Sequence, residues 1–232
     1  MGSATSKNGY LSLTPDPEDD PKAQLKVGRV LYRIPVTAWP AIITTIFTVN
    51  MAPFPHSNIS GDGFSFIMVP DASPPPLNSV GGFLGIMNTT AQGVFVGQLA
   101  VEFDTFKNSF TNDISDNHVG IDTTSITRPI AARNLPIKLA SGKDIRIRIV
   151  YHAKVRKLIV AMANEEFRPM QTVAIQELKL SETVPKFVYV GFTASTGLYS
   201  GTHRILNWGF KSTHAGPIDS LNDHTRNITY QK

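Results

Sequence analysis

The chain has 232 residues, a length that fits one large domain or two small ones, and it lacks cysteine, which excludes disulfides, cysteine-ligated zinc and thiol catalysis. Its formal net charge is +4, but only 17% of the residues are charged, so no basic patch of the kind that binds nucleic acid is expected. The 41% share of hydrophobic residues excludes disorder, and the longest apolar stretch, residues 39–54, is interrupted by Pro40 and Pro53, so no membrane span is expected.

Along the chain, apolar residues recur with the period of two that indicates a β-strand with one face in water. In residues 144–150 three isoleucines alternate with two arginines, and residues 29–36 alternate in the same way. Clusters of Gly, Pro, Asn, Asp or Ser bound each run, as expected for strands. Further strands are expected in residues 43–51, 63–69, 94–106, 118–126, 157–163, 172–180, 186–195 and 203–210.

About a dozen strands without a convincing helix indicate an all-β protein. Because that number is large for one sheet, we expect two antiparallel sheets packed as a large sandwich or jelly roll. The sequence shows no repeat period, and the three prolines at 74–76 are interpreted as a loop and not as a linker. We therefore expect a single domain spanning residues 1–232.

Residues 102–118, EFDTFKNSFTNDISDNH, concentrate side chains that bind metal ions. Side chains at i and i+2 of a strand share a face, so Glu102 and Asp104 are expected side by side. Asn108 and Asp113 follow on a polar loop, and His118 opens the next strand. Oxygen ligands suit calcium, whereas an imidazole added to carboxylates suits manganese or another first-row transition metal. The segment predicts two adjacent metal sites; the alternative is a polar hairpin loop whose spacing is chance.

This segment resembles the metal loop of the legume-type (L-type) plant lectins, whose pattern is E-F-D-T-[FY]-x-N, then Asp, then His-[IV]-G-I-D. Further blocks are similar to that family and follow in its order: GDGFSF (61–66), GGFLGI (81–86), HVGIDTTSI (118–126) and VGFTASTGLYSGTHRILNWGF (190–210). The chain is thus similar to legume seed lectins and to the lectin domains of plant lectin receptor kinases. The resemblance implies a concanavalin A-like jelly roll.

The resemblance also implies one Ca²⁺ and one Mn²⁺ per subunit, with ligands carried over residue by residue. The implied transition-metal ligands are Glu102, Asp104, Asp113 and His118. The implied calcium ligands are Asp104, Asn108, Asp113 and the carbonyl of Phe106. Ser125 falls where the family holds a metal-bound water, which makes it an outer partner of the site.

A sugar ring requires a carboxylate, an amide, close backbone donors and an aromatic platform. In the family these roles fall on the positions that are Asp62, Asn108, Gly82 and Phe106 here, and main-chain groups of Leu198 and Tyr199 complete the pocket. Alternatively, the aspartate between two glycines is only a turn residue. The sequence departs from the family at Gly61, where alanine is usual, which leaves the cis geometry of the following peptide open.

Several other residues have structural interpretations. Trp208 is expected in the core, whereas His203 and His214, which have no partners in the pattern, are expected at the surface. Three asparagines stand in N-glycosylation sequons, whose occupancy the sequence does not decide. They are Asn58, Asn88 and Asn227.

The ends of the chain differ from the family pattern. The chain starts within the family's opening edge strand, and it continues for 22 residues after residue 210, ending DHTRNITYQK. Placing the C-terminal NITYQK ahead of the N-terminal residues restores a segment similar to that opening. We therefore predict a circular permutation in which residues 225–231 form a strand beside residues 10–13. The alternative is an unrelated tail after a truncated start.

The implied function is carbohydrate binding without enzymatic activity. The short loop TGLYSG (196–201) is similar to that of mannose- and glucose-binding relatives and predicts this sugar class, whereas the metal-loop spacing is similar to a galactose binder, which is the alternative. A two-metal hydrolase is a second alternative, because paired metals activate water, although the segment offers no spare general base. A fragment of a receptor ectodomain is a third.

The implied partners are glycans and glycoproteins. Monosaccharide sites bind with about millimolar Kd, roughly −4 kcal/mol, so useful avidity favours a homodimer or tetramer. The N-terminal residues contain no apolar targeting segment, and the chain is interpreted as the mature form of a secreted or vacuolar plant glycoprotein with a role in defence.

Overall fold

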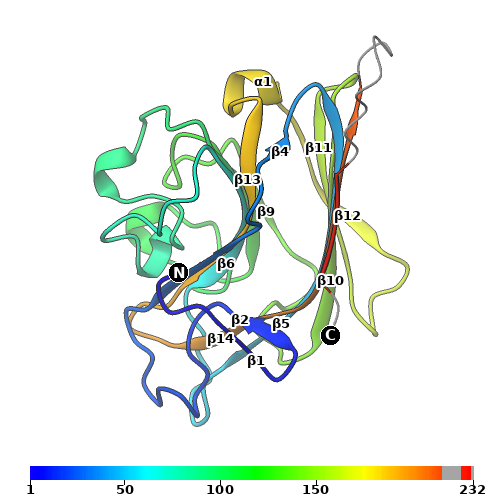
Figure 1. The fold of residues 1–232 in the computed structure, drawn as a ribbon. Helices are drawn as coiled ribbons and strands as arrows, with labels where there is room; N and C mark the ends of the chain where they lie inside the picture. Colours follow the sequence, from blue (N-terminus) through cyan, green and yellow to red (C-terminus); the bar gives the residue numbers. More distant parts are fainter. Residues whose placement is uncertain (216–225, 231–232) are drawn as a thin grey trace.

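The computed structural model describes residues 1–215 and 226–230, and within them fifteen strands form two antiparallel sheets. The two sheets face each other as layers (Figure 1). The described residues hold one short helix, α1 (Leu180–Thr183), and the 3-10 turns η1 (Gly81–Phe83), η2 (Thr89–Ala91) and η3 (Ser109–Thr111). No helix among them is long and apolar enough to cross a membrane. The all-β jelly roll is confirmed.

The back sheet has the strand order β1 (Thr5–Lys7), β2 (Tyr10–Ser12), β14 (Gly201–His214), β5 (Ala41–Pro53), β10 (Asp144–His152), β11 (Lys157–Ala163) and β12 (Gln171–Glu177), with β15 (Arg226–Tyr230) paired to β14. The front sheet has the order β3 (Val27–Leu31), β13 (Phe187–Ser195), β6 (Gly63–Val69), β7 (Leu99–Asp104), β8 (His118–Asp122) and β9 (Ala131–Asn134), with β4 (Val36–Thr37) paired to β13.

Several predicted strands are divided or end earlier in the structure than the sequence pattern predicts. Residues 29–36 divide between β3 and β4, since Pro35 has no amide hydrogen to continue the ladder. Residues 94–98 lie outside β7, where Gly97 has a φ of 69° that extended strands do not use. Residues 123–126 follow the end of β8. Apolar alternation therefore overestimates strand length where apolar residues continue into a packed loop next to the strand.

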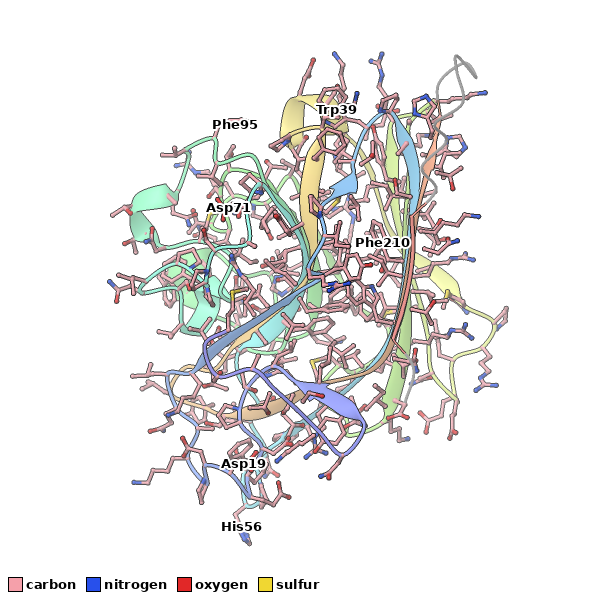
Figure 2. The ribbon with its side chains drawn as sticks, viewed as in Figure 1. Asp19, Trp39, His56, Asp71, Phe95 and Phe210 are labelled. Carbon is pink, nitrogen blue, oxygen red and sulfur yellow. The ribbon has the colours of Figure 1, made fainter. Side chains whose placement is uncertain are left out.

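The space between the sheets is filled by aromatic side chains. Phe47 of β5 lies with its ring centroid 5.0 Å from that of Phe192 on β13, and Trp208 lies 5.1 Å from Phe192 on another side. Trp208 is thus in the core, as predicted. Figure 2 places Phe210 in the same layer between the sheets. The inward face of each strand in this region is consequently apolar.

Strands β6 and β7 are buried along their whole length, on both faces. Their second face packs against Leu84, Ile86 and Met87, which come from the segment that follows η1. Figure 1 shows the loops and short turns that lie against this outer side of the front sheet. Polar residues at the ends of these two strands are therefore held in a buried environment.

Strands β2 and β15 occupy the same edge of β14. β15 pairs with residues 208–212 of β14, and β2 pairs with residues 204–205; both are antiparallel to β14. They consequently run in the same direction, one after the other, along that edge. Residues 226–230 thus form a strand, as expected, but it pairs with β14 and not with residues 10–13, and the circular permutation stays a prediction. Residues 225 and 231 of the expected strand lie outside the described residues.

The surface position expected for His203 was wrong, because its side chain is fully buried. The N-terminal segment covers this part of β14: Leu13 N donates to His203 O at 2.9 Å, and Thr14 Oγ1 lies 2.9 Å from His203 Nδ1. Burial lowers the pKa of His203 to about 3. His214 is exposed, as expected.

Acid is expected to destabilise the protein partly through His203. Its folded-state pKa of about 3 lies below the ordinary 6.5, so its stabilising contribution is present above pH 6.5 and is lost as the pH falls toward 3. The slope is at most about 1.4 kcal/mol per pH unit. Urea unfolding of His203→Gln should show a shallower loss of free energy on acidification. The exposed-site control His56→Asn should keep the wild-type slope, and a wild-type slope for His203→Gln would contradict the argument.

Candidate functional site

The acidic residues of segment 102–118 converge where β7 ends and β8 begins. Antiparallel pairing places Asp104 opposite His118 and Glu102 opposite Gly120. Glu102 Oε1 lies 3.4 Å from His118 Nε2. A Cβ atom at residue 120 would lie 2.0 Å from Glu102 Oε1, so only glycine lets the Glu102 side chain lie across β8. Two neighbouring strands thus bring an imidazole and two carboxylates together, as predicted.

The loop between these strands folds back over the acids. Asn108 N donates to Asp113 Oδ2 at 2.6 Å, and Phe106 N donates to Asp104 Oδ1 at 2.8 Å. As a result, one ligand atom from each of Asp104, Asp113 and His118 lies within 4.8 Å of the other two. The loop therefore brings Asp113 to the strand acids although it is nine residues from Asp104 in sequence.

The His118 ring is oriented by a carbonyl group. His118 Nδ1 lies 2.8 Å from Ser115 O, which accepts a hydrogen bond from the protonated Nδ1. This leaves Nε2, the atom nearest Glu102, as the nitrogen with a free lone pair when the ring is neutral. A carbonyl that fixes the tautomer in this way is typical of metal-ligating histidines.

The electrostatics of the cluster favour a divalent cation. Burial raises the pKa of Glu102, Asp104 and Asp113, and the charge of Asp113 raises the pKa of the other two further. Burial alone lowers the pKa of His118, but the hydrogen bond and charge of Glu102 outweigh it and raise the pKa. Because these carboxylates are buried and repel one another, the donor set fits calcium and a first-row transition metal.

Asp122 belongs to the same cluster, although the sequence analysis did not single it out. Its side chain has no exposed surface, and neither carboxylate oxygen has a hydrogen-bond partner among the described residues. Burial, followed by the charge of Glu102, raises its pKa well above the usual value. The available signal was strand alternation, because Asp122 shares a face of β8 with His118.

Asp62 lies beside the metal loop and is 2% exposed. Its backbone is held between two elements: Asp62 N donates to Ser195 O at 2.9 Å, and Thr105 N donates to Asp62 O at 2.7 Å. The Gly61–Asp62 peptide is cis in this chain, as in the family pattern, although glycine replaces alanine. Asp62 is thus a fixed part of the site and not a loose turn residue.

The Asp62 carboxylate has one free oxygen. In the amide orientation that satisfies its neighbours, the Asn108 nitrogen donates to Asp62 Oδ1 and to Phe106 O, both at 3.1 Å. Asp62 Oδ2 has no partner among the described residues. Burial raises the pKa of Asp62 to about 7, against the lowering effect of the Asn108 hydrogen bond. An acceptor of this kind suits a ligand that carries hydroxyl donors.

Two glycines let the backbone approach these polar side chains. A Cβ atom at Gly82 would lie 2.6 Å from a terminal atom of the Asn108 carboxamide, and one at Gly197 would lie 2.6 Å from Asp62 Oδ2. Neither position tolerates a side chain without displacing the polar group. The role expected for Gly82 fits this geometry, whereas Gly197 was missed by sequence reasoning, although it stands in the predicted TGLYSG loop.

Aromatic and apolar side chains of the predicted sugar site come from two loops. The Phe106 and Tyr199 ring centroids lie 5.3 Å apart, and Leu198 is 76% exposed. Gln24 supports this loop by donating from Nε2 to Leu198 O at 2.6 Å. The predicted pocket residues from four separate segments therefore lie together.

Ser125 is the one predicted site residue whose contacts lie elsewhere. Its hydroxyl donates to Gln92 Oε1 at 2.8 Å and lies 3.0 Å from Thr127 Oγ1. Arg128 N donates to Ser125 Oγ at 3.1 Å. In this structure Ser125 connects two loops, and its expected role beside a metal-bound water stays a prediction.

Comparison with known proteins gives a consistent result. The family profile described as "Legume lectin domain" matches residues 1–226. Lectin DB58 from Vigna unguiculata subsp. cylindrica is 32% identical, over 98% of this chain and 85% of its own length. A protein named galactose-binding lectin from Arachis hypogaea is 35% identical, over 81% of this chain and 68% of its own length.

A solved lectin structure has a similar fold. A lectin from Bauhinia forficata in complex with GalNAc superposes with a TM-score of 0.82 at 26% identity, covering 93% of this chain and 92% of that one. These relatives are lectins, which bind carbohydrate and catalyse no reaction. With the profile spanning nearly all of the sequence and the carbohydrate-binding fold present, the chain belongs to the legume lectin family.

Proposed function

We propose that the chain binds a monosaccharide unit of a glycan in the pocket bordered by Asp62, Gly82, Asn108, Phe106 and the 198–199 loop. The observation that carries this proposal is the buried Asp62 carboxylate, whose Oδ2 has no partner among the described residues while Oδ1 accepts from Asn108. A buried acceptor without a partner costs free energy until a donor reaches it. Two neighbouring sugar hydroxyls are donors of the required kind.

The proposed metal ligands are Glu102, Asp104, Asp113 and His118 for manganese, and Asp104, Asp113, Asn108 and Phe106 O for calcium. When bound, the two cations would neutralise the buried acids and fix the loop. The chain's own contribution is preorganisation: Asn108 is held at its backbone by Asp113, and its amide positions the Asp62 carboxylate.

The sugar class expected from the short 196–201 loop is mannose or glucose. Galactose is the second candidate, because the 35% identical relative from Arachis hypogaea is named a galactose-binding lectin. The arrangement of Asp62, Asn108 and Gly82 serves either class, since each offers adjacent hydroxyls. Discrimination must therefore come from the loop residues Leu198 and Tyr199, which border the pocket.

A glycan array, run with calcium and manganese and again after chelation, tests this function. We expect binding to mannose- or glucose-terminated glycans that disappears with chelator, because the loop loses the charge balance that shapes it. Galactose-selective binding would support the second candidate. Binding that persists fully after the ions are stripped would contradict the metal-dependent mechanism.

We also propose that the chain acts as a homodimer or tetramer, recognises glycoprotein glycans and resides in a secreted or vacuolar compartment with a role in defence. A single millimolar site gives little retention on a cell surface, so avidity favours more than one subunit. Two sequon asparagines, Asn58 and Asn227, are exposed and accessible to a glycan. Asn88 instead donates to Leu77 O and accepts from Ala91 N.

A further inference from the structure

Arg29 of β3 is a buried charge that the proposed pocket does not contact. The residue is 4% exposed, and alternation along β3 directs its side chain to the outer face of the front sheet. Within residues 1–215 and 226–230, no carboxylate forms an ion pair with it. Burial lowers the pKa of Arg29 to about 10 against the opposing charge of Asp71, so the guanidinium stays protonated at neutral pH.

Three backbone carbonyls take the place of a counter-ion. Arg29 Nη1 donates to Ser73 O at 3.3 Å and to Pro74 O at 3.5 Å, and Nη2 donates to Gly85 O at 2.6 Å. These carbonyls belong to the two arms of one loop, residues 73–85, called the glycine loop below. Ser73 and Pro74 lie on the arm that enters it, and Gly85 lies on the arm that leaves it. A planar guanidinium with several donors reaches both arms at once.

The glycine loop carries the backbone wall of the proposed sugar pocket. A Cβ atom at Gly82 would lie 2.6 Å from the Asn108 carboxamide, so a small displacement of Gly82 changes its contact with that amide. One end of the turn around Gly82 is fixed where β13 ends. Gly81 N donates to Thr196 O at 3.1 Å, and Ser195 Oγ donates to Gly81 O at 2.6 Å.

The other end of this turn is fixed by Arg29. Gly85 O accepts from Arg29 Nη2, and Gly85 N donates to Ser79 O at 2.8 Å. Leu84 is fully buried in the apolar cluster on the outer face of the front sheet, and that contact keeps the segment attached without giving it a direction. Arg29 therefore supplies the directional link between this end of the turn and β3, and Gly82 lies between the two fixed ends.

We propose that Arg29 is a positioning residue for sugar binding, which joins both arms of the glycine loop to β3 and thereby holds Gly82 against Asn108. This inference rests on the proposed function. Burying a charge without a carboxylate partner costs free energy, and an apolar side chain would pack on the same face of β3 without that cost. The guanidinium adds a defined loop geometry, which is what a preorganised pocket requires.

Arg29→Lys tests this proposal, because it keeps the positive charge and removes the fork that reaches both arms. Methyl mannoside and methyl galactoside are titrated into the calcium- and manganese-loaded protein. For the probe that binds the wild type, we expect Arg29→Lys to bind roughly tenfold more weakly, as a misplaced pocket wall allows. The Tm increase on adding both ions should persist, because Arg29 contacts none of the proposed metal ligands.

Two further measurements distinguish positioning from a general loss of stability. Hydrogen exchange in Arg29→Lys should be faster than in the wild type at the amides of residues 81–85 and unchanged in residues 106–113 of the metal loop. In Arg29→Ala, millimolar guanidinium should restore much of the lost affinity, at a concentration far below that which unfolds proteins. Ammonium at the same concentration should not, because it lacks the planar fork.

The matched control is Arg204→Lys, which alters an arginine outside the glycine loop that donates from Nε to Asp16 Oδ1 at 2.8 Å. It should lower the Tm and bind the probe as the wild type does. Affinity of Arg29→Lys within about twofold of wild type would overturn the proposal, as would an equal loss in Arg204→Lys, unchanged exchange at residues 81–85 or no effect of guanidinium. Absence of all binding in the wild type would instead reject the proposed function.

Discussion

Chelating the divalent ions is expected to lower the Tm by roughly 5–10 °C for each ion site and to abolish sugar binding. An ion at about a hundredfold its Kd stabilises the folded state by about 2.7 kcal/mol, and each kcal/mol shifts the Tm of a chain this size by about 2–4 °C. Without the ions, buried carboxylates of Glu102, Asp104 and Asp113 repel one another. Differential scanning calorimetry in EDTA and in calcium plus manganese measures the shift.

The Tm difference between ion-loaded and ion-free protein is expected to depend on pH, because a rise in pH affects the stability of the two forms in opposite directions. The folded-state pKa values of Glu102, Asp104 and Asp113 are raised, so in the ion-free protein their contribution is fully stabilising below the unfolded-state pKa near 4 and is lost as the pH rises through the raised values. The ions bind the deprotonated carboxylates, so their contribution grows with pH. The Tm difference between loaded and stripped protein should widen from pH 5 to pH 8.

The variant Asp104→Asn distinguishes charge repulsion within the acidic cluster from nonspecific destabilisation of the fold. Asp104→Asn should raise the Tm of the stripped protein at pH 8, because it removes one of the repelling charges, and should eliminate the Tm increase on adding calcium and manganese. Asp144→Asn, at an exposed position on β10, should behave as the wild type in both conditions. A wild-type ion response from Asp104→Asn would remove this residue from the ligand set.

Asp62→Asn is expected to weaken sugar binding more than about a hundredfold while leaving the fold intact. Hydrogen bonds to a charged group contribute about 1.5–3 kcal/mol each, and the substitution exchanges a carboxylate acceptor for an amide of the same shape. The backbone contacts with Ser195 and Thr105 do not involve the substituted atoms. Titration of the best array ligand into the variant, in calcium and manganese, measures the loss.

The Tm increase on adding the two ions is the internal control for Asp62→Asn. Asp62→Asn should show the wild-type Tm increase on adding calcium and manganese, because Asp62 is not among the proposed ligands. Sugar affinity retained within a fewfold would show that the carboxylate is not the acceptor. Loss of the ion response together with sugar binding would show that Asp62 acts by maintaining the metal loop.

The sequence alone determined the fold class and the chemistry of the metal segment. Alternation at period two is a local property, so strands such as β6 and β11 were predicted within a residue of their ends. The strand β7 and the EFDTFKN pattern likewise placed Glu102 beside Asp104 without any tertiary information. Asp122 shares the alternating face of β8, so the same rule could have found it.

Only the tertiary structure decided burial on both faces and contacts between distant segments. Histidine carries no local sign of which segment covers it, and His203 is buried because Thr14, which is 189 residues away in sequence, packs over its strand. The approach of Gly197 to Asp62 and the end-to-end placement of β15 and β2 are likewise non-local. Periodicity specifies which face of a strand is apolar, whereas only chain folding specifies what lies against it.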